Sequence, residues 1–171
     1  MAISTMNMAV FMVLMFPEGR FASFRFHGIL KRIKLWHAVL TAPYGGGTMY
    51  RTAIEKLYKW KASRHRKPLI IEGARQVGKT WLMKEFGKNA YADTVYINFD
   101  SNSRMADLFA SDLDTDRLIM GIELYAGRKI NPDNTLLIFD EVQEVPRALS
   151  SLKYFYEDVP RYHIMCAGSL L

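Results

Sequence analysis

Cysteine is almost absent from this sequence: Cys166 stands alone among 171 residues. A single cysteine excludes an internal disulfide and any metal site built from several thiolates. The four histidines are far apart along the chain and lack the spacing of zinc ligands. Because disulfides are typical of secreted proteins, this composition favours a reducing compartment, and we expect the protein to be cytoplasmic.

Long apolar runs are missing as well. The longest one, residues 8–16, has nine residues, whereas a membrane-spanning helix needs about 20. A signal peptide would need a basic residue before this run and a small-residue cleavage site after it, and the sequence has neither. We therefore expect no membrane span, and secretion is the weaker interpretation.

Proline and glycine are scarce too, with six and eleven residues, which excludes collagen-like and linker-like chains. Hydrophobic residues make up 50% of the chain and charged residues 23%, so the sequence can bury a core and is not typical of a disordered tail. A length of 171 residues fits one domain with an appendage.

The net charge of +6 is distributed unevenly. Residues 1–48 contain five basic residues and one acidic residue, whereas residues 49–171 contain 18 basic and 16 acidic residues. We therefore separate an atypical N-terminal extension, residues 1–48, from a domain at 49–171. A ribosome-binding sequence could encode the glycines just before Met49, so one hypothesis makes Met49 the natural start. A flexible basic arm that docks on a partner is the alternative.

From Met49 onward, apolar runs alternate with amphipathic segments. The patterns predict strands over 69–71, 94–99, 135–139 and 162–167, and helices over 50–63, 80–88, 104–110, 114–126 and 146–158. Strands that alternate with helices favour an α/β fold with a parallel sheet and right-handed crossovers. We expect the most apolar strand, 135–139, to lie directly beside strand 69–71.

A glycine-rich segment follows the first of these strands and opens a helix. Residues 73–80 match the pattern G-x-x-x-x-G-K-[ST] at every fixed position. In such a loop the backbone N–H groups surround a phosphate, and the dipole of the following helix favours the same negative charge. We therefore predict that the following residues bind a nucleotide: Gly73, Ala74, Arg75, Gln76, Val77, Gly78, Lys79, Thr80 and Trp81.

Two side chains of this loop have predicted chemical roles. Lys79 carries a full positive charge that can reach the β- and γ-phosphates, and we predict that it assists catalysis. The hydroxyl of Thr80 is the predicted ligand for Mg²⁺. A glycine-rich turn without a ligand is the alternative interpretation of the segment.

A pair of acidic residues, Asp140 and Glu141, ends the strand over 135–139. Ligands of open α/β sheets bind at the carboxyl ends of the strands, so both carboxylates are expected beside the phosphate-binding loop. We assign Asp140 to Mg²⁺ and Glu141 to the general base that activates water. A solvated strand end is the alternative.

Taken with their spacing, these motifs resemble AAA+ P-loop ATPases of the additional-strand group. Residues 50–171 are similar to uncharacterised prokaryotic AAA-type ATPases in four motifs, at 73–80, 96–99, 137–143 and 167–169. The resemblance implies a three-layer αβα sandwich with a mostly parallel sheet, and ATP and Mg²⁺ as cofactors. It also implies that Ser169 is a polar sensor residue that takes part in catalysis.

Members of that family continue beyond the position of Leu171, with a fifth strand and further domains. The resemblance therefore implies that residues 49–171 form a partial domain that lacks its last strand. In that case strand 69–71 would lie at an open edge of the sheet, which favours aggregation unless another segment covers it.

The resulting prediction is a Mg²⁺-dependent ATPase that converts ATP to ADP and phosphate. The alternative is a nucleotide-dependent interaction module without significant hydrolysis. An oligomer or a protein partner is expected from the family. Nucleic acid is a weaker candidate partner, based on basic residues with two aromatic residues between them: Lys56, Tyr58, Lys59, Trp60, Lys61, Arg64, Arg66 and Lys67.

Overall fold

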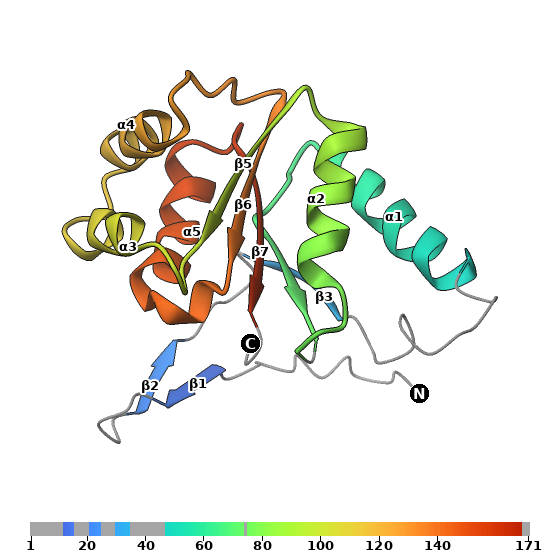
Figure 1. Ribbon diagram of the computed structural model, residues 1–171, viewed down its shortest axis with the longest axis horizontal. Coiled ribbons are helices and arrows are strands. Elements are labelled where there is room, and N and C mark those ends of the chain that lie inside the picture. The colour runs from blue at the N-terminus through green and yellow to red at the C-terminus, as the bar shows by residue number, and fades with distance from the viewer. Residues whose placement is uncertain (1–11, 16–20, 25–29, 35–46, 74, 169–171) are drawn as a thin grey trace, which may run out of the picture.

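A computed structural model describes residues 12–15, 21–24, 30–34, 47–73 and 75–168. Five parallel strands form the main sheet, in the order β3, β4, β7, β6, β5 (Figure 1). Their bounds are Lys31–Lys34 for β3, Leu69–Glu72 for β4, His163–Gly168 for β7, Thr135–Asp140 for β6 and Asp93–Asn98 for β5. The strands β1 (Met12–Met15) and β2 (Phe21–Phe24) form a separate antiparallel pair.

Helices cover both faces of the sheet. The helices α1 (Gly47–Lys61) and α2 (Lys79–Ala90) lie on one side, as Figure 1 shows. The helices α3 (Ser103–Ala110), α4 (Thr115–Ala126) and α5 (Pro146–Asp158) lie on the other side. A 3₁₀ turn, η2 (Val142–Glu144), connects β6 to α5. The predicted α/β fold with three layers is confirmed.

The sheet separates two hydrophobic cores, and β6 contributes to both. All six residues of β6 are buried. Leu137 and Phe139 pack with the helices α3, α4 and α5, whereas Leu136 and Ile138 pack with α1 and α2. Because successive side chains of a strand point to opposite faces, a strand covered on both sides is apolar along most of its length, and in β6 only the two end residues, Thr135 and Asp140, are polar. This requirement explains why the run over 135–139 has no polar alternation.

The neighbours of the strand β4 differ from two expectations. The edge beside β4 is not open, because β3 pairs with it in parallel, with Lys31 opposite Leu69 and Lys34 opposite Glu72. The strand β6 does not lie directly beside β4 either, because β7 pairs with both of them. Both expectations were wrong for the same reason: strand order depends on long-range pairing, which the periodicity of a single strand does not encode.

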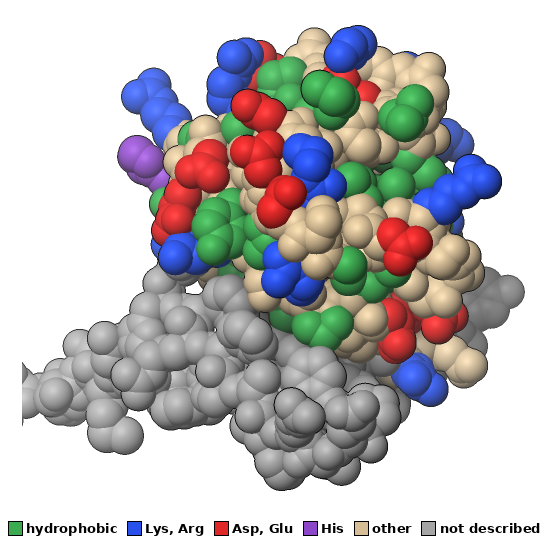
Figure 2. All heavy atoms as spheres, turned by 90° about the vertical axis from the view of Figure 1, so that its left-hand side faces the viewer, with side chains coloured by type: hydrophobic (Ala, Val, Ile, Leu, Met, Phe, Trp, Pro, Cys, Tyr) green, Lys and Arg blue, Asp and Glu red, His purple; other side chains and the backbone are tan. Residues whose placement is uncertain are grey.

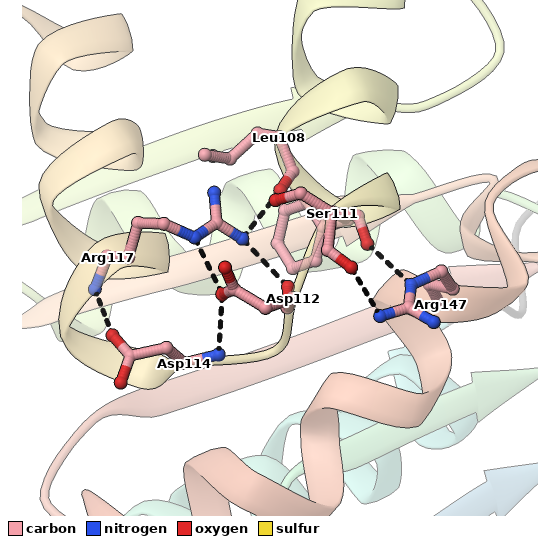
Figure 3. Close-up of polar contacts among 7 residues, drawn as sticks. Leu108, Ser111, Asp112, Asp114, Arg117 and Arg147 are labelled. Carbon is pink, nitrogen blue, oxygen red and sulfur yellow. Dashed lines mark hydrogen bonds and ion pairs between the residues drawn. The ribbon is translucent and has the colours of Figure 1, made fainter.

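Two arginines hold the connection between α3 and α4 (Figure 3). Arg117 donates hydrogen bonds to the carbonyls of Leu108 (3.0 Å) and Asp112 (2.7 Å) and pairs with the Asp112 carboxylate. Arg147, at the start of α5, donates to the carbonyls of Phe109 (3.1 Å) and Ser111 (2.7 Å). These carbonyls lie at the end of α3, where helices leave acceptors without intrahelical partners. Arg147 therefore joins α5 to the end of α3.

Candidate functional site

A cavity of about 690 Å³ opens at the carboxyl end of the sheet. Residues from four segments line it: the loop after β4, the start of α2, the end of β5 and the turn after β6. The lining residues are Arg75, Gln76, Gly78, Lys79, Thr80, Trp81, Asn98, Asp100, Glu141 and Glu144. Clefts that bind small molecules usually have volumes of about 300–1,000 Å³, so a cofactor of nucleotide size is within this range.

The loop before α2 adopts backbone angles that ordinary residues avoid. Gln76 has a φ of 61° and Gly78 a φ of 82°, both in the left-handed region. Such angles at a non-glycine residue cost about 1 kcal/mol or more and persist where the surroundings require them. Gly78 is also the N-cap of α2 and provides no capping side chain. The helix α4, in contrast, has Asp114 as its N-cap, and the carboxylate of Asp114 accepts a hydrogen bond from the N–H of Arg117 at 2.8 Å.

Lys79 lies at the first position of α2, with its side chain buried. Its Nζ donates a hydrogen bond to the carbonyl of Gly73 at 2.8 Å, which closes the loop. Burial lowers the pKa of the Lys79 ammonium, and the nearby carboxylates of Glu141 and Asp140 oppose that shift. The Lys79 side chain therefore lines the cavity with little exposure to water.

Thr80 and Asp140 connect the helix α2 to the strand β6. The Thr80 hydroxyl donates to Oδ2 of Asp140 at 2.7 Å. Asp140 is 3% exposed, and its Oδ2 also accepts a hydrogen bond from the Tyr96 hydroxyl at 2.9 Å. The other oxygen, Oδ1, accepts the N–H of Glu141 at 3.2 Å. Three donors therefore satisfy one buried carboxylate, which is the arrangement that burial of a charge requires.

Glu141 follows Asp140 in a left-handed conformation, with a φ of 49°. This turn directs the chain away from the sheet and leaves Glu141 in the cavity wall. Its Oε2 accepts a hydrogen bond from Nε2 of Gln143 at 2.6 Å. Gln143 also donates to Oε1 of Glu144 at 3.2 Å. A hydrogen bond from Gln143, within the same turn, thus orients Glu141.

Six of the nine predicted nucleotide-binding residues line this cavity: Arg75, Gln76, Gly78, Lys79, Thr80 and Trp81. Gly73 is not among the lining residues, but its carbonyl accepts the hydrogen bond from Lys79. Val77 is 5% exposed and packs in the core under α2, so its backbone but not its side chain can serve a ligand. Ala74, predicted as part of the loop, and Ser169, predicted as the sensor, lie outside the described residues. Their assignments stay predictions.

The prediction missed four residues around the cavity. Asn98 is the last residue of β5, Asp100 follows that strand, and Glu144 belongs to the turn η2. Tyr96 contacts Asp140 from within β5. The pairing of β5 with β6 aligns Asn98 with Asp140. Since parallel strands end at a common edge, polar residues at the end of every predicted strand, including 98–100, would have been reasonable candidates.

The basic stretch of α1 and the following loop is partly internal. Trp60 is fully buried, and its Nε1 donates to the carbonyl of Lys67 at 2.7 Å. Lys61 donates to the carbonyl of Ala90, and Arg66 donates to the carbonyl of Lys61.

On the face that carries α3 and α4, Figure 2 shows acidic, basic and apolar side chains intermingled. The described side chains of that face therefore form no basic patch of the kind typical of nucleic-acid binding.

No helix within the described ranges is long and apolar enough to cross a bilayer. The described residues also contain no group of three or more His, Cys, Asp or Glu side chains that could hold a metal ion by themselves. Thr80 and Asp140 could contribute a hydroxyl and a carboxylate to the ligands of a divalent cation.

Comparison with known proteins adds one family. No curated protein matches the chain. Among solved structures the chain is similar to PCH-2 of C. elegans, with a TM-score of 0.46 and 15% identity; the match covers 71% of this chain and 37% of that one. The family model described as "AAA domain" matches residues 65–171. Since this match covers more than half of the chain and includes both the loop and the acidic turn, the chain belongs to the AAA domain family.

Proposed function

We propose that this AAA-type domain, which belongs to a nucleotide-binding family, binds ATP with Mg²⁺ and hydrolyses it to ADP and phosphate. The observation that carries the proposal is the 2.7 Å hydrogen bond from Thr80 to Asp140. It joins the phosphate-binding loop to the acidic strand end beside a cavity of about 690 Å³. The two motifs are 60 residues apart along the chain, so their meeting at one cavity supports a common function.

Phosphate recognition would depend on the backbone and on Lys79. The first N–H groups of α2 have no intrahelical acceptor, and Gly78 adds no capping side chain. An anion at this position is favoured by those donors and by the helix dipole. Lys79 now donates to the Gly73 carbonyl and would transfer hydrogen bonds to the phosphates when a nucleotide binds.

The donors at the end of β6 fit Mg²⁺. This ion prefers oxygen ligands, and proteins usually supply one or two of them while phosphates and water supply the rest. Thr80 and Asp140 provide a hydroxyl and a carboxylate within 2.7 Å of each other. Bound there, Mg²⁺ would neutralise part of the charge on the β- and γ-phosphates.

Hydrolysis would use Glu141 as the general base. Its carboxylate accepts a proton from a water molecule while the water oxygen forms a bond to the γ-phosphorus. The bond from that phosphorus to the bridging oxygen breaks, and the products are ADP and phosphate. Gln143 donates a hydrogen bond to Oε2 of Glu141 at 2.6 Å and so orients this carboxylate at the cavity wall. Lys79 would stabilise the charge that develops on the phosphate oxygens.

The test measures ATP affinity and turnover in parallel for the wild type, Lys79→Ala and Lys88→Ala. Lys88 is an exposed lysine of the same helix and serves as the matched control. Loss of a charge-assisted contact worth about 2–3 kcal/mol predicts that Lys79→Ala weakens ATP binding about 100-fold. Equal affinities of the two variants would contradict the proposal. Wild-type binding without turnover would instead support the interaction module as the function.

A further inference from the structure

The Tyr96 hydroxyl contacts the same carboxylate oxygen that Thr80 contacts. The Tyr96 oxygen lies 2.9 Å from Oδ2 of Asp140. We propose that Tyr96 is a positioning residue that fixes the Asp140 carboxylate for Mg²⁺ binding, an inference that rests on the proposed function. Tyr96 itself lies on β5, outside the loop and outside the acidic turn.

The carboxylate needs this contact because it is almost completely buried. Asp140 is 3% exposed, and its hydrogen bonds come from Thr80, Tyr96 and the N–H of Glu141. When Thr80 also becomes a ligand of a cation, its hydroxyl oxygen must serve two partners. Tyr96 then remains as the side-chain donor whose hydroxyl serves Asp140 alone among the described residues. Donors of this kind orient metal-binding groups in proteins, and their loss typically reduces metal affinity about 10- to 100-fold.

The position of Tyr96 depends on the strand register and on one contact of its ring. The pairing of β5 with β6 places Tyr96 opposite Ile138, two residues before Asp140. Nζ of Lys84 lies 3.6 Å from the centre of the Tyr96 ring, in the geometry of a cation–π contact. On α2, Lys84 contacts Tyr96 and Thr80 contacts Asp140. Because Lys84 follows Thr80 by one helical turn, the two residues share one face of the helix. Both features support the direction of the Tyr96 hydroxyl toward Asp140.

The test compares nucleotide affinity with and without Mg²⁺. A fluorescent ATP analogue is titrated into the full chain in Mg²⁺ and in EDTA, and the ratio of the two dissociation constants gives the Mg²⁺ enhancement. Tyr96→Phe should lower this enhancement about 10-fold while it leaves the affinity in EDTA unchanged. Tyr154→Phe removes a hydroxyl from a tyrosine of α5 that is 39% exposed and should behave as wild type. Asp140→Asn defines complete loss of the enhancement.

Each outcome decides the inference. An unchanged enhancement in Tyr96→Phe, with a normal loss in Asp140→Asn, overturns the role of Tyr96 and leaves the proposed function intact. An equal loss of affinity in Mg²⁺ and in EDTA also overturns it, because a general structural defect would act on both. If the wild type binds no nucleotide, the function and the inference fail together.

A second variant covers a failure of folding. Thermal unfolding would show whether Tyr96→Phe retains the wild-type structure. If it does not, Lys84→Met removes the charge above the ring and keeps the hydroxyl. It should lower the Mg²⁺ enhancement about threefold, from a cation–π contact of roughly 0.5–1 kcal/mol. An unchanged enhancement in Lys84→Met would then overturn the inference.

Discussion

The two ends of the sheet both contain buried polar side chains, but they use them differently. At the carboxyl end, Lys79, Thr80 and Glu141 line a cavity of about 690 Å³. At the amino end, the Tyr91 hydroxyl lies 2.6 Å from Nδ1 of His163, and both residues are less than 10% exposed. The polar groups of the carboxyl end line a cavity of nucleotide size, whereas Tyr91 and His163 at the amino end form a hydrogen bond with each other.

Backbone strain and charge separate the two ends as well. The two described non-glycine residues with positive φ, Gln76 and Glu141, both lie at the carboxyl end. At the amino end the positive charges of Lys61 and Arg66 surround a histidine that burial keeps neutral, and Asp133 partly offsets them. Strained backbone around an open cavity is typical of functional sites, and a closed set of hydrogen bonds is typical of stabilising ones. The comparison therefore predicts that substitutions at the carboxyl end alter catalysis and those at the amino end alter stability.

The largest expected effect is on turnover at the carboxyl end. Glu141→Gln keeps the size of the side chain but removes the base, so turnover should fall by about 10²–10⁴-fold while ATP remains bound. The measurement is steady-state phosphate release alongside nucleotide affinity. Glu157→Gln, on the exposed surface of α5, is the control. Full turnover in Glu141→Gln would assign the base to another residue.

The next effect is the pH dependence of stability at the amino end. Burial and the charges of Arg66 and Lys61 lower the pKa of His163 from 6.5 to about 4. Between pH 6.5 and about pH 4, His163 therefore binds a proton in the unfolded chain but not in the folded chain. The free energy of unfolding should fall by about 2–3 kcal/mol as the pH decreases from 6.5 to 4, through this residue alone.

Urea unfolding at several pH values measures this dependence. His163→Gln should begin less stable at pH 7 but lose less stability toward pH 4 than the wild type. His65→Gln, at an exposed position, should follow the wild-type curve. The same pH slope in all three proteins would show that His163 is not the responsible group.

A smaller effect concerns the helix that reaches from one end to the other. Gly87 lies near the end of α2, where an added Cβ would be 2.6 Å from Oγ1 of Thr94. Gly87→Ala should therefore reduce the free energy of unfolding by about 1–3 kcal/mol. Chemical denaturation measures the change, and the double variant with Thr94→Ala should recover part of it. No recovery would mean that the close approach to Thr94 is not the cause.

The smallest expected effect is from Tyr91→Phe. This variant removes the hydroxyl next to His163 and keeps the ring, so stability should fall by about 1 kcal/mol. ATP affinity should remain at the wild-type value, since Tyr91 lies at the amino end. A loss of affinity without a loss of stability would contradict the division between the two ends.

Much of this arrangement could be predicted from the sequence. Each predicted strand and helix of residues 50–168 exists within three residues of its expected bounds, because local periodicity and caps determine such elements. The loop at 73–80 and the acidic pair at 140–141 were expected at one edge of the sheet, and they meet there. Their catalytic roles stay predictions.

The remaining features depend on contacts between distant segments. The pairing of β3 with β4 could not be predicted, since the basic pattern of Lys31–Lys34 gives no sign of a strand at the edge of a sheet. Tyr96 lies within the predicted strand over 94–99, but its contact with Asp140 depends on the register of β5 against β6. Register follows from the packing of both strands and cannot be obtained from either sequence alone.

The insertion of β7 between β4 and β6 has a consequence for how the chain can vary. Two inter-strand spacings, about 10 Å in total, separate β4, which leads to the phosphate-binding loop, from β6, which ends at Asp140. Main-chain hydrogen bonds fix that distance, whatever side chains β7 carries. Substitutions within β7 that preserve its packing should therefore leave the distance between β4 and β6 unchanged.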